Sequence, residues 1–267
     1  MLLGPERARG LLHDVMGYTD VAIPDTAFER DTRWDEALAF TERLGERAEA
    51  LGLGFGVKFT NTLIVENRRD FFPADQKEMY LSGPPLHVLA MTLLDRLSSA
   101  LPGVLDVPGH DGDVMVSFSA GITKDNLADS LAAGVQPTTV CSDLLKPGGY
   151  GRLAPMLRSL TSTLRDEEAA DLPAFKAARQ AAAVEAGHAT TAEAHVGHVR
   201  GDGIGAYHLT GNEKLPRQVD HELEMFGCVA CNFCITVCPN DAFFSIASLA
   251  DGCTEHSRLA GKRRHDT

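Results

Sequence analysis

The chain has 267 residues, enough for one or two domains with a sizeable core. Its 44% hydrophobic and 23% charged residues are ordinary for a globular protein, but its net charge of −12 argues against nucleic acid as a partner, because phosphates attract positive charge. No apolar stretch approaches the length of a membrane span, and the N-terminus lacks the charged-then-apolar order of a signal peptide. Six cysteines, four of them in one motif, suit a reducing compartment, so we expect a cytoplasmic protein.

Helical and strand patterns alternate through the first 165 residues. Apolar residues recur at helical spacing over 35–51, 86–101 and 153–164. Short runs typical of buried strands stand between these helices, at 55–59, 114–118 and 138–141. Helices that alternate with short buried strands indicate βα units on a parallel sheet, and therefore an α/β fold.

The composition changes after residue 165. Residues 166–187 are rich in Ala and Glu, which indicates a connecting helix interrupted near Pro173. Residues 188–220 are polar and carry four histidines without the spacing of a metal site, so we expect those side chains to be exposed. They are His188, His195, His198 and His208. The glycine-rich run 201–205 has no strand pattern before it and is interpreted as a loop, so 166–222 is predicted to be a helical and polar linker.

A dense cysteine motif near the C-terminus is the strongest chemical signal in the sequence. Its spacing is C-x2-C-x2-C-x3-C-P, that of bacterial ferredoxins. The cysteines are Cys228, Cys231, Cys234 and Cys238. Thiolates this close together on a looping backbone can reach the corners of one iron–sulfur cube, so we predict them to be the ligands of a [4Fe–4S] cluster. The predicted ferredoxin-type module covers 223–252, and 253–267 is predicted to be a disordered tail.

Other roles for these cysteines are a zinc knuckle or a disulfide pair. Zinc sites usually separate two C-x2-C pairs widely, which this motif does not do. The fourth cluster ligand stays open, because in two-cluster ferredoxins the cysteine before the proline serves the other cluster. Cys238 could fold back, Cys253 could reach over, or an exogenous ligand could complete the site. We expect a three-cysteine site with a labile fourth position.

Several short segments give the chain a resemblance to known redox proteins. They are Thr60-Asn61-Thr62, Ser82-Gly83, Ser119-Ala120-Gly121-Ile122 and Val140-Cys141-Ser142. These look like the later part of the dihydroorotate and dihydropyrimidine dehydrogenase barrels. The runs 78–83 and 146–150 are closer to the selenate reductase-like iron–sulfur subunit family, which joins such a barrel to a C-terminal ferredoxin module. The resemblance implies that 1–165 is the C-terminal part of a TIM-type (β/α)8 barrel, followed by a small [4Fe–4S] ferredoxin-like module.

The same resemblance implies a cofactor site at the strand ends. Phosphates in such barrels bind on the loops after the late strands and at a helix N-terminus. The cofactor-binding residues implied are Asn61, Thr62, Ser119, Gly121 and Ser142, the first two near a flavin ring. FMN is the implied cofactor, although Ala120–Gly121 stands where the related flavin enzymes have paired glycines. No acid–base pair stands out, so no catalytic residue is named.

Two departures from the family shape the expected function. About three barrel strands can be recognised where closure needs eight, and the family's second cysteine motif is missing, so we expect a fragment. We interpret the chain as part of an iron–sulfur oxidoreductase that passes electrons through its cluster to or from a barrel site, a redox partner protein or a partner subunit. The alternatives are a cluster-bearing docking module without turnover and a non-functional gene fragment.

Overall fold

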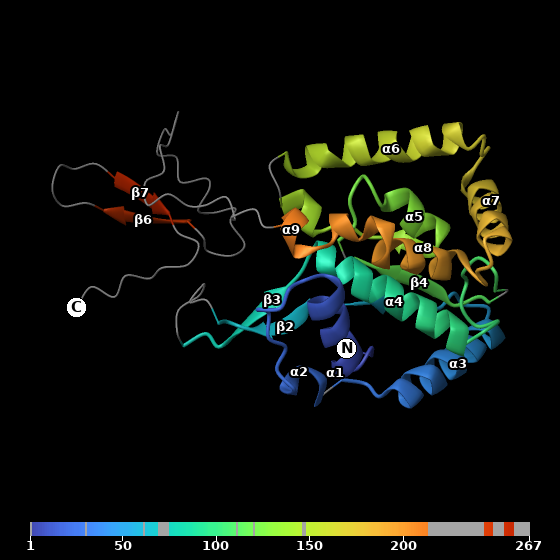
Figure 1. Ribbon diagram of the computed structural model, residues 1–267, viewed down its shortest axis with the longest axis horizontal. Coiled ribbons are helices and arrows are strands. Elements are labelled where there is room, and N and C mark those ends of the chain that lie inside the picture. Colours follow the sequence, from blue (N-terminus) through green and yellow to red (C-terminus); the bar gives the residue numbers. More distant parts are fainter. Residues whose placement is uncertain are drawn as a thin grey trace. The chain divides into compact units, whose positions relative to one another are not determined.

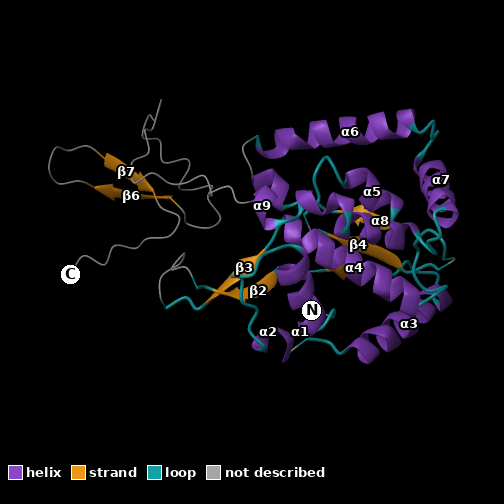
Figure 2. Cartoon of the chain, in the orientation of Figure 1, coloured by secondary structure: helices purple, strands orange, loops and turns teal. Residues whose placement is uncertain are grey.

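The computed structural model describes most of the first 212 residues (Figures 1 and 2). The described ranges are 2–29, 31–60, 62–68, 75–110, 112–119, 121–145 and 148–212, together with the backbone of 243–247 and 254–258. The chain divides into two compact units. The first comprises Met1–Glu66 and Met79–Asn212, and the second comprises Asn67–Glu78 and Glu213–Thr267. The first unit is a mixed α/β body, as the sequence predicts.

Three parallel strands form the sheet of this body. They are β1 (Gly56–Phe59), β4 (Met115–Phe118) and β5 (Val135–Thr138), in the order β1-β4-β5. The central strand β4 is the best buried, since Val116 and Phe118 are both 0% exposed. The strand predicted over 138–141 lies three residues earlier in the structure, directly after the helix-ending Gly134. Strand β5 tolerates Pro137 because it lies at an edge of the described sheet.

Helices connect the parallel strands, in the arrangement that parallel pairing requires. Helix α4 (Pro84–Ala100) lies between β1 and β4, and α5 (Leu127–Ala132) lies between β4 and β5. The β1–α4 connection also contains β2 (Leu63–Glu66) and β3 (Glu78–Leu81), which pair in a two-stranded sheet. The predicted helix over 86–101 is confirmed, and it starts two residues earlier because Pro84 and Pro85 occupy its first turn, where no N–H is needed.

The remaining elements of the described chain are mostly helical. Before the sheet they are α1 (Pro5–Gly10), the π-helix η1 (Leu11–Val15), α2 (Thr26–Glu29) and α3 (Trp34–Ala50). After it come the 3-10 helices η2 (Ser142–Leu145) and η3 (Gly149–Arg152), then α6 (Leu153–Asp166), α7 (Leu172–Glu185), α8 (Thr191–Arg200), the 3-10 helix η4 (Asp202–Ala206) and α9 (Leu209–Asn212). Strands β6 (Phe243–Ala247) and β7 (Thr254–Arg258) pair antiparallel in the second unit.

The interruption expected near Pro173 is confirmed. Helix α6 ends at Asp166, and α7 begins anew with Pro173 in its first turn. The side chain of Asp171 caps α7 by accepting a hydrogen bond from the N–H of Ala174 at 2.8 Å. Thr190 caps α8 in the same way, accepting from the N–H of Glu193 at 3.1 Å.

The chain after residue 165 contributes to the core of the first unit. Phe175 of α7 is 0% exposed, and Val196, Val199 and Tyr207 belong to the main apolar cluster. The expectation of exposed histidines is wrong for His195, which is 7% exposed on the inner face of α8. The glycine run 201–205, interpreted as a loop, is largely the 3-10 helix η4, which packs against α8.

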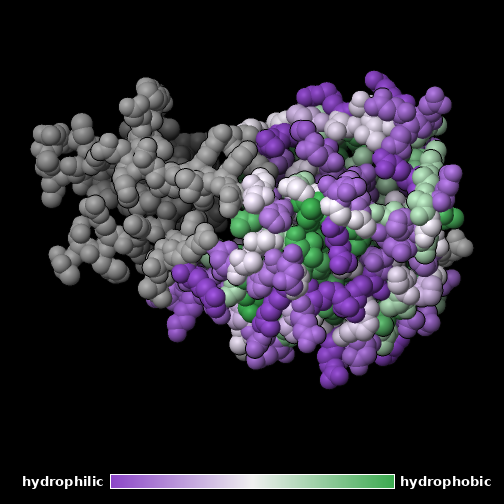
Figure 3. Space-filling model, viewed as in Figure 1, coloured by the Kyte–Doolittle hydropathy of each residue, from purple (hydrophilic) through white to green (hydrophobic). Residues whose placement is uncertain are grey.

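The described surface is mainly hydrophilic, with hydrophobic residues exposed among the polar ones (Figure 3). Large apolar side chains that are at least 40% exposed include Phe40, Leu44 and Leu51 at α3, and Tyr150 and Leu157 at η3 and α6. Among the described helices, none is long and apolar enough to cross a membrane.

Candidate functional site

The carboxyl ends of the three parallel strands lie along one edge of the sheet. Thr60 follows β1 and Ser119 follows β4, and the strand residues just before them, Phe59 and Phe118, are paired in register. Thr139 follows β5 and is tied to β4, because its hydroxyl and its N–H both donate to the carbonyl of Phe118, at 3.0 and 3.3 Å. Ligands of open α/β sheets and of barrels bind at this edge.

The loop after β4 is held closely against the start of α4. Gly121 has a φ of 61°, and a Cβ placed on it would lie 2.6 Å from the carbonyl oxygen of Gly83. Only glycine therefore fits there without displacing the backbone. Asn126 fixes the rest of the loop: its Oδ1 accepts from the N–H of Thr123 at 2.8 Å, and its Nδ2 donates to the carbonyl of Gly121 at 3.0 Å.

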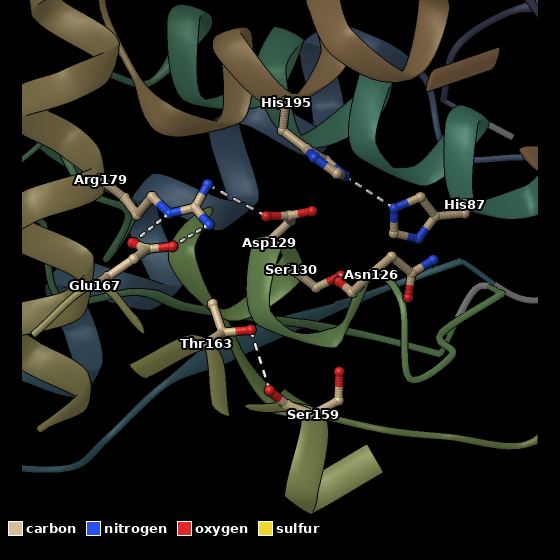
Figure 4. Close-up of polar contacts among 9 residues, drawn as sticks. All are labelled: His87, Asn126, Asp129, Ser130, Ser159, Thr163, Glu167, Arg179 and His195. Atoms are coloured by element: carbon tan, nitrogen blue, oxygen red, sulfur yellow. Dashed lines mark hydrogen bonds and ion pairs between the residues drawn. The ribbon is translucent and has the colours of Figure 1, made fainter. Parts of the chain in front are cut away.

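A buried polar cluster continues from this loop into the helices. We define it as Asn126, Tyr207, His87 and His195, which are between 0 and 7% exposed. The Nδ2 of Asn126 also donates to the Tyr207 hydroxyl at 3.2 Å, and the Tyr207 ring stacks on His87 with 5.2 Å between centroids. The Nε2 atoms of His87 and His195 are 3.0 Å apart (Figure 4). The cluster thereby connects α4, α8 and η4 to the loop after β4.

Burial shifts the proton affinities within this cluster. Loss of solvation lowers the pKa of His195 to about 4, against an ordinary value of 6.5, although the negative charge of Asp129 acts in the other direction. Loss of solvation also raises the pKa of Tyr207, against the hydrogen bond from Asn126, which lowers it. Both side chains are therefore neutral at pH 7. At that pH, hydrogen bonds between neutral side chains connect the helices of the cluster to the loop after β4.

The loop after β5 is held by an ion pair. Ser142 begins η2, and Asp143 beside it is 4% exposed. The guanidinium of Arg152 donates two hydrogen bonds to the carboxylate of Asp143, at 2.9 and 3.0 Å, which is the bidentate geometry favoured by arginine. These bonds raise the pKa of Arg152 further above its ordinary value. The preceding Cys141, which its apolar sequence context suggests is buried, is exposed.

Two of the predicted cofactor-binding residues, Ser119 and Gly121, lie on the loop after β4. Ser142 begins η2, beyond the end of β5 at Thr138. Thr62 is exposed just before β2, and Asn61 lies outside the described residues. The hydroxyl of Thr60 is buried and has no hydrogen-bond partner among the described residues. The four predicted cluster ligands, Cys228, Cys231, Cys234 and Cys238, also lie outside the described residues.

Within the described ranges, no group of three or more His, Cys, Asp or Glu side chains is placed to hold a metal ion. The opposite, amino end of the sheet instead carries an open pocket of about 690 Å³ between α3 and the segments that precede β1 and β4. Its carboxylates are Glu42, Glu46, Glu49, Asp106 and Asp113. This pocket lies away from the strand ends where barrel ligands bind.

No sequence motif marks His87, Asn126 or Tyr207. Each stands alone in the sequence without a motif, and they converge only because α4, the β4–α5 loop and η4 meet in the fold. A weak signal does exist for His87, since it stands in an otherwise apolar helix directly after two prolines. A polar side chain in such a helix needs a buried partner.

Comparisons with known proteins agree with the α/β body. Residues 1–191 match the family described as "Oxidoreductase YgfK, N-terminal TIM-barrel domain". Two proteins named "Putative oxidoreductase YgfK", from Escherichia coli strain K12 and from Escherichia coli O157:H7, are each 38% identical to the chain over 159 residues. The aligned region is 60% of this chain but only 14% of each relative. No solved structure matches the chain. Because the family match covers most of the chain, this protein belongs to the oxidoreductase family that carries the YgfK N-terminal TIM-barrel domain.

Proposed function

We propose that this protein is an electron-transfer component of an iron–sulfur oxidoreductase. Electrons would pass through a [4Fe–4S] cluster on Cys228, Cys231, Cys234 and Cys238, to or from the strand ends of the barrel or a redox partner protein. The observation that carries the proposal is the C-x2-C-x2-C-x3-C-P spacing. Membership of an oxidoreductase family supports a redox role in general. The cysteine spacing supports the more specific inference that an iron–sulfur cluster carries the electrons.

The chemistry of the donor set fits an iron–sulfur cluster. Four thiolates within eleven residues offer soft ligands at a density that one cube needs. The apolar residues Val229, Phe233 and Ile235 stand between them and would limit access of water to the cluster. The cluster supplies one-electron transfer when bound, and the chain's own part is to hold the thiolates and to limit solvent.

FMN is the group that the family resemblance implies for the barrel, and we include it in the proposal. The hydroxyls of Ser119 and Ser142 would bind its phosphate, since Ser119 directly follows β4 and Ser142 begins η2 after the neighbouring strand β5. The buried hydroxyl of Thr60, without a partner in the described structure, supports a polar ligand at this edge. Heat-released flavin, measured by fluorescence and by mass spectrometry, tests this part separately from the cluster.

The cluster is tested by anaerobic reconstitution of the full chain followed by iron and sulfide analysis. We expect a brown protein with about four iron atoms per chain, as for cubane clusters. Replacing Cys231 by Ser should remove most of the iron, whereas Cys141→Ser, a matched change at an exposed cysteine, should leave it in place. Stoichiometric zinc without iron would contradict the proposal.

The fourth ligand is decided by electron paramagnetic resonance. A three-iron signal after exposure to air supports a labile fourth position. A four-iron cluster that survives Cys238→Ser but is lost in Cys253→Ser would make Cys253 the ligand instead. Reduction of the cluster by dithionite and reoxidation by an artificial dye separates an electron carrier from a docking module, because a docking module turns nothing over.

A further inference from the structure

The last part of the first unit reaches back to the loop after β4. Tyr207 directly follows η4 and stands 81 residues after Asn126 in the sequence. Its hydroxyl accepts a hydrogen bond from Nδ2 of Asn126 at 3.2 Å, and the two side chains are only 7 and 5% exposed. Tyr207 lies beyond residues 1–191, the range that matches the barrel family. A residue outside the matched range therefore contacts a side chain that shapes one of the strand-end loops.

The side-chain amide of Asn126 uses both of its hydrogens and its oxygen. Nδ2 donates to the carbonyl of Gly121 at 3.0 Å and to the hydroxyl of Tyr207, while Oδ1 accepts from the N–H of Thr123 at 2.8 Å. An amide turned end for end would place its oxygen against the Gly121 carbonyl, so this orientation alone satisfies the backbone partners. The orientation of the Asn126 amide thus fixes both ends of the turn 121–123.

This turn belongs to the loop at which the proposed ligand would bind. Ser119 directly follows β4, and Thr60 directly follows the neighbouring strand β1. The preceding residues, Phe118 and Phe59, are paired in register, so Ser119 and Thr60 leave the sheet side by side. The Thr60 hydroxyl is buried and has no hydrogen-bond partner in the described structure, which favours a polar ligand at this edge. Such a ligand would meet the loop that Asn126 holds.

Tyr207 is itself held by the packing of the segment 191–212, which comprises α8, η4 and α9. Its ring stacks on His87 of α4, with 5.2 Å between centroids and 5° between the ring planes. Val196 and Val199 of α8 belong to the main apolar cluster together with Tyr207. The Tyr207 hydroxyl therefore reaches the loop after β4 only while this segment is docked on the α/β body.

We propose that Asn126 and Tyr207 are positioning residues, which couple the docking of the segment 191–212 to ligand binding at the loop after β4. The inference rests on the proposed function in one respect, namely that this loop binds the phosphate of FMN. With the segment docked, Tyr207 holds the Asn126 amide in the orientation that shapes the turn, so binding has less of the loop to order.

Such a coupling acts in both directions. A ligand that binds more tightly when the segment is docked must strengthen the docking by the same factor. The segment leads in sequence directly into the stretch that carries the cysteine motif. Ligand binding at the strand ends would therefore also bias the part of the chain that leads to the proposed cluster.

The positioning role is tested first without a ligand, by hydrogen exchange of single amides in the full chain, followed by nuclear magnetic resonance. Tyr207→Phe removes the hydroxyl but keeps the ring that stacks on His87. It should speed exchange of the Thr123 amide, which donates to Asn126, by about 5-fold, the effect of one lost hydrogen bond. Amides of α3 should keep their rates. Tyr150→Phe, at a side chain that is 83% exposed, is the matched control and should change neither.

Titration with FMN, followed by flavin fluorescence, tests the coupling to the ligand. Tyr207→Phe should weaken FMN binding by about 5-fold, the same factor, whereas Tyr150→Phe should leave it unchanged. In the unaltered chain, saturating FMN should protect amides of 191–207 more than amides of α3, and Tyr207→Phe should remove this excess. A Tyr207 that only stabilised the fold would not change FMN affinity under conditions where the protein is fully folded.

Unchanged exchange of the Thr123 amide in Tyr207→Phe would overturn the proposal, whether or not FMN binds. Equal affinity of Tyr207→Phe and of the unaltered chain for FMN would overturn it as well. Absence of FMN binding to the unaltered chain would instead contradict the FMN part of the proposed function, and the Thr123 amide then decides whether Tyr207 positions the loop. Should Tyr207→Phe not fold, the protection of 191–207 by FMN in the unaltered chain decides.

Discussion

Helices α3 and α4 have the same length but opposite relations to the core. Both contain 17 residues, yet α4 buries twelve of them, whereas α3 buries only Ala37 and Thr41. The apolar pattern predicts a core-facing stripe on both helices. On α3 part of this apolar stripe remains exposed to solvent, since Leu44 is 47% exposed. Periodicity thus identifies an amphipathic helix, but the neighbours that the fold supplies decide how much of its apolar face is covered.

The difference follows from position in the sheet. Helix α4 connects β1 to the central β4 and is overlaid by α8, so it has neighbours on several sides (Figure 1). Helix α3 precedes the edge strand β1 and runs beside the acidic pocket at the amino end of the sheet. Its Gly45 allows close contact with Val114, since a Cβ there would lie 2.7 Å from a Val114 methyl group. Trp34 and Leu38 also pack against the core, whereas Phe40 and Leu44 are more than 40% exposed.

The largest expected contrast is between matched leucines on the two helices. Leu94→Ala on α4 removes a side chain that is 0% exposed and should destabilise the first unit by about 3 kcal/mol, within the range for buried leucines. Leu44→Ala on α3 should change stability by about 0.5 kcal/mol or less. Urea unfolding followed by circular dichroism measures both. Equal losses would show that α3 is covered in solution.

The second contrast compares two glycines with nearly equal backbone angles. Gly121 in the loop after β4 has a φ of 61° and touches Gly83, whereas Gly52 at the end of α3 has a φ of 65° and open space around it. Gly52→Ala should cost about 1 kcal/mol of strain, and Gly121→Ala about 2 kcal/mol or more, because a clash is added. Thermal unfolding ranks the two. A cost no greater than that of Gly52→Ala would mean that the Gly83 contact readily relaxes.

The third prediction concerns the hydrogen bond between Tyr207, which follows η4, and Asn126 in the loop after β4. Tyr207→Phe removes the hydroxyl that accepts from Asn126 and should cost about 1 kcal/mol. Tyr150→Phe, at a side chain that is 83% exposed, is the matched control and should be neutral. The comparison uses urea midpoints at pH 7.5. A neutral Tyr207→Phe would assign the support of this loop to the other bonds of Asn126.

The smallest effect on stability, but a visible one on association, is expected at the exposed stripe of α3. Replacing Leu44 and Leu51 by Ser should leave the unfolding midpoint nearly unchanged. It should lower any self-association, since exposed apolar patches and open strand edges promote contacts between copies. Sedimentation velocity at several concentrations tests this. An unchanged sedimentation coefficient would mean that this stripe makes no contact between copies.

Much of the fold could be predicted from local sequence patterns. The helices α3, α4 and α6, and strands β1 and β4, lie within a few residues of their predicted ranges because their apolar periodicity is strong. Strand β5 begins three residues before its predicted range, and it includes Pro137, a residue that is rare inside strands and is tolerated at a sheet edge. The burial of His195 could not be predicted, since a polar sequence with scattered histidines gives no period.

The candidate site also has a part that the sequence predicts and a part that only the structure shows. Ser119 and Gly121 could be placed at a strand end from sequence alone, because short polar and small residues directly after a buried strand mark that edge. Ser142 lies farther from its strand than predicted, since β5 ends at Thr138 and Ser142 begins η2. The contacts that hold these loops in place could not be predicted, because they form only in the folded protein. The Gly83–Gly121 approach and the Asp143–Arg152 pair are each made by residues that look unremarkable in isolation.

The separation of His87 and His195 along the chain also orders the steps of folding. Paired residues of β1 and β4, such as Lys58 and Ser117, are closer in sequence than the two histidines, which are 108 residues apart. Closing a longer loop costs more conformational entropy, so the parallel pairs are favoured to form first. During synthesis, α4 is complete well before His195 leaves the ribosome. His87 therefore lies in a partly open core until α8 has been synthesised. The docking of α8 then removes His87 from water.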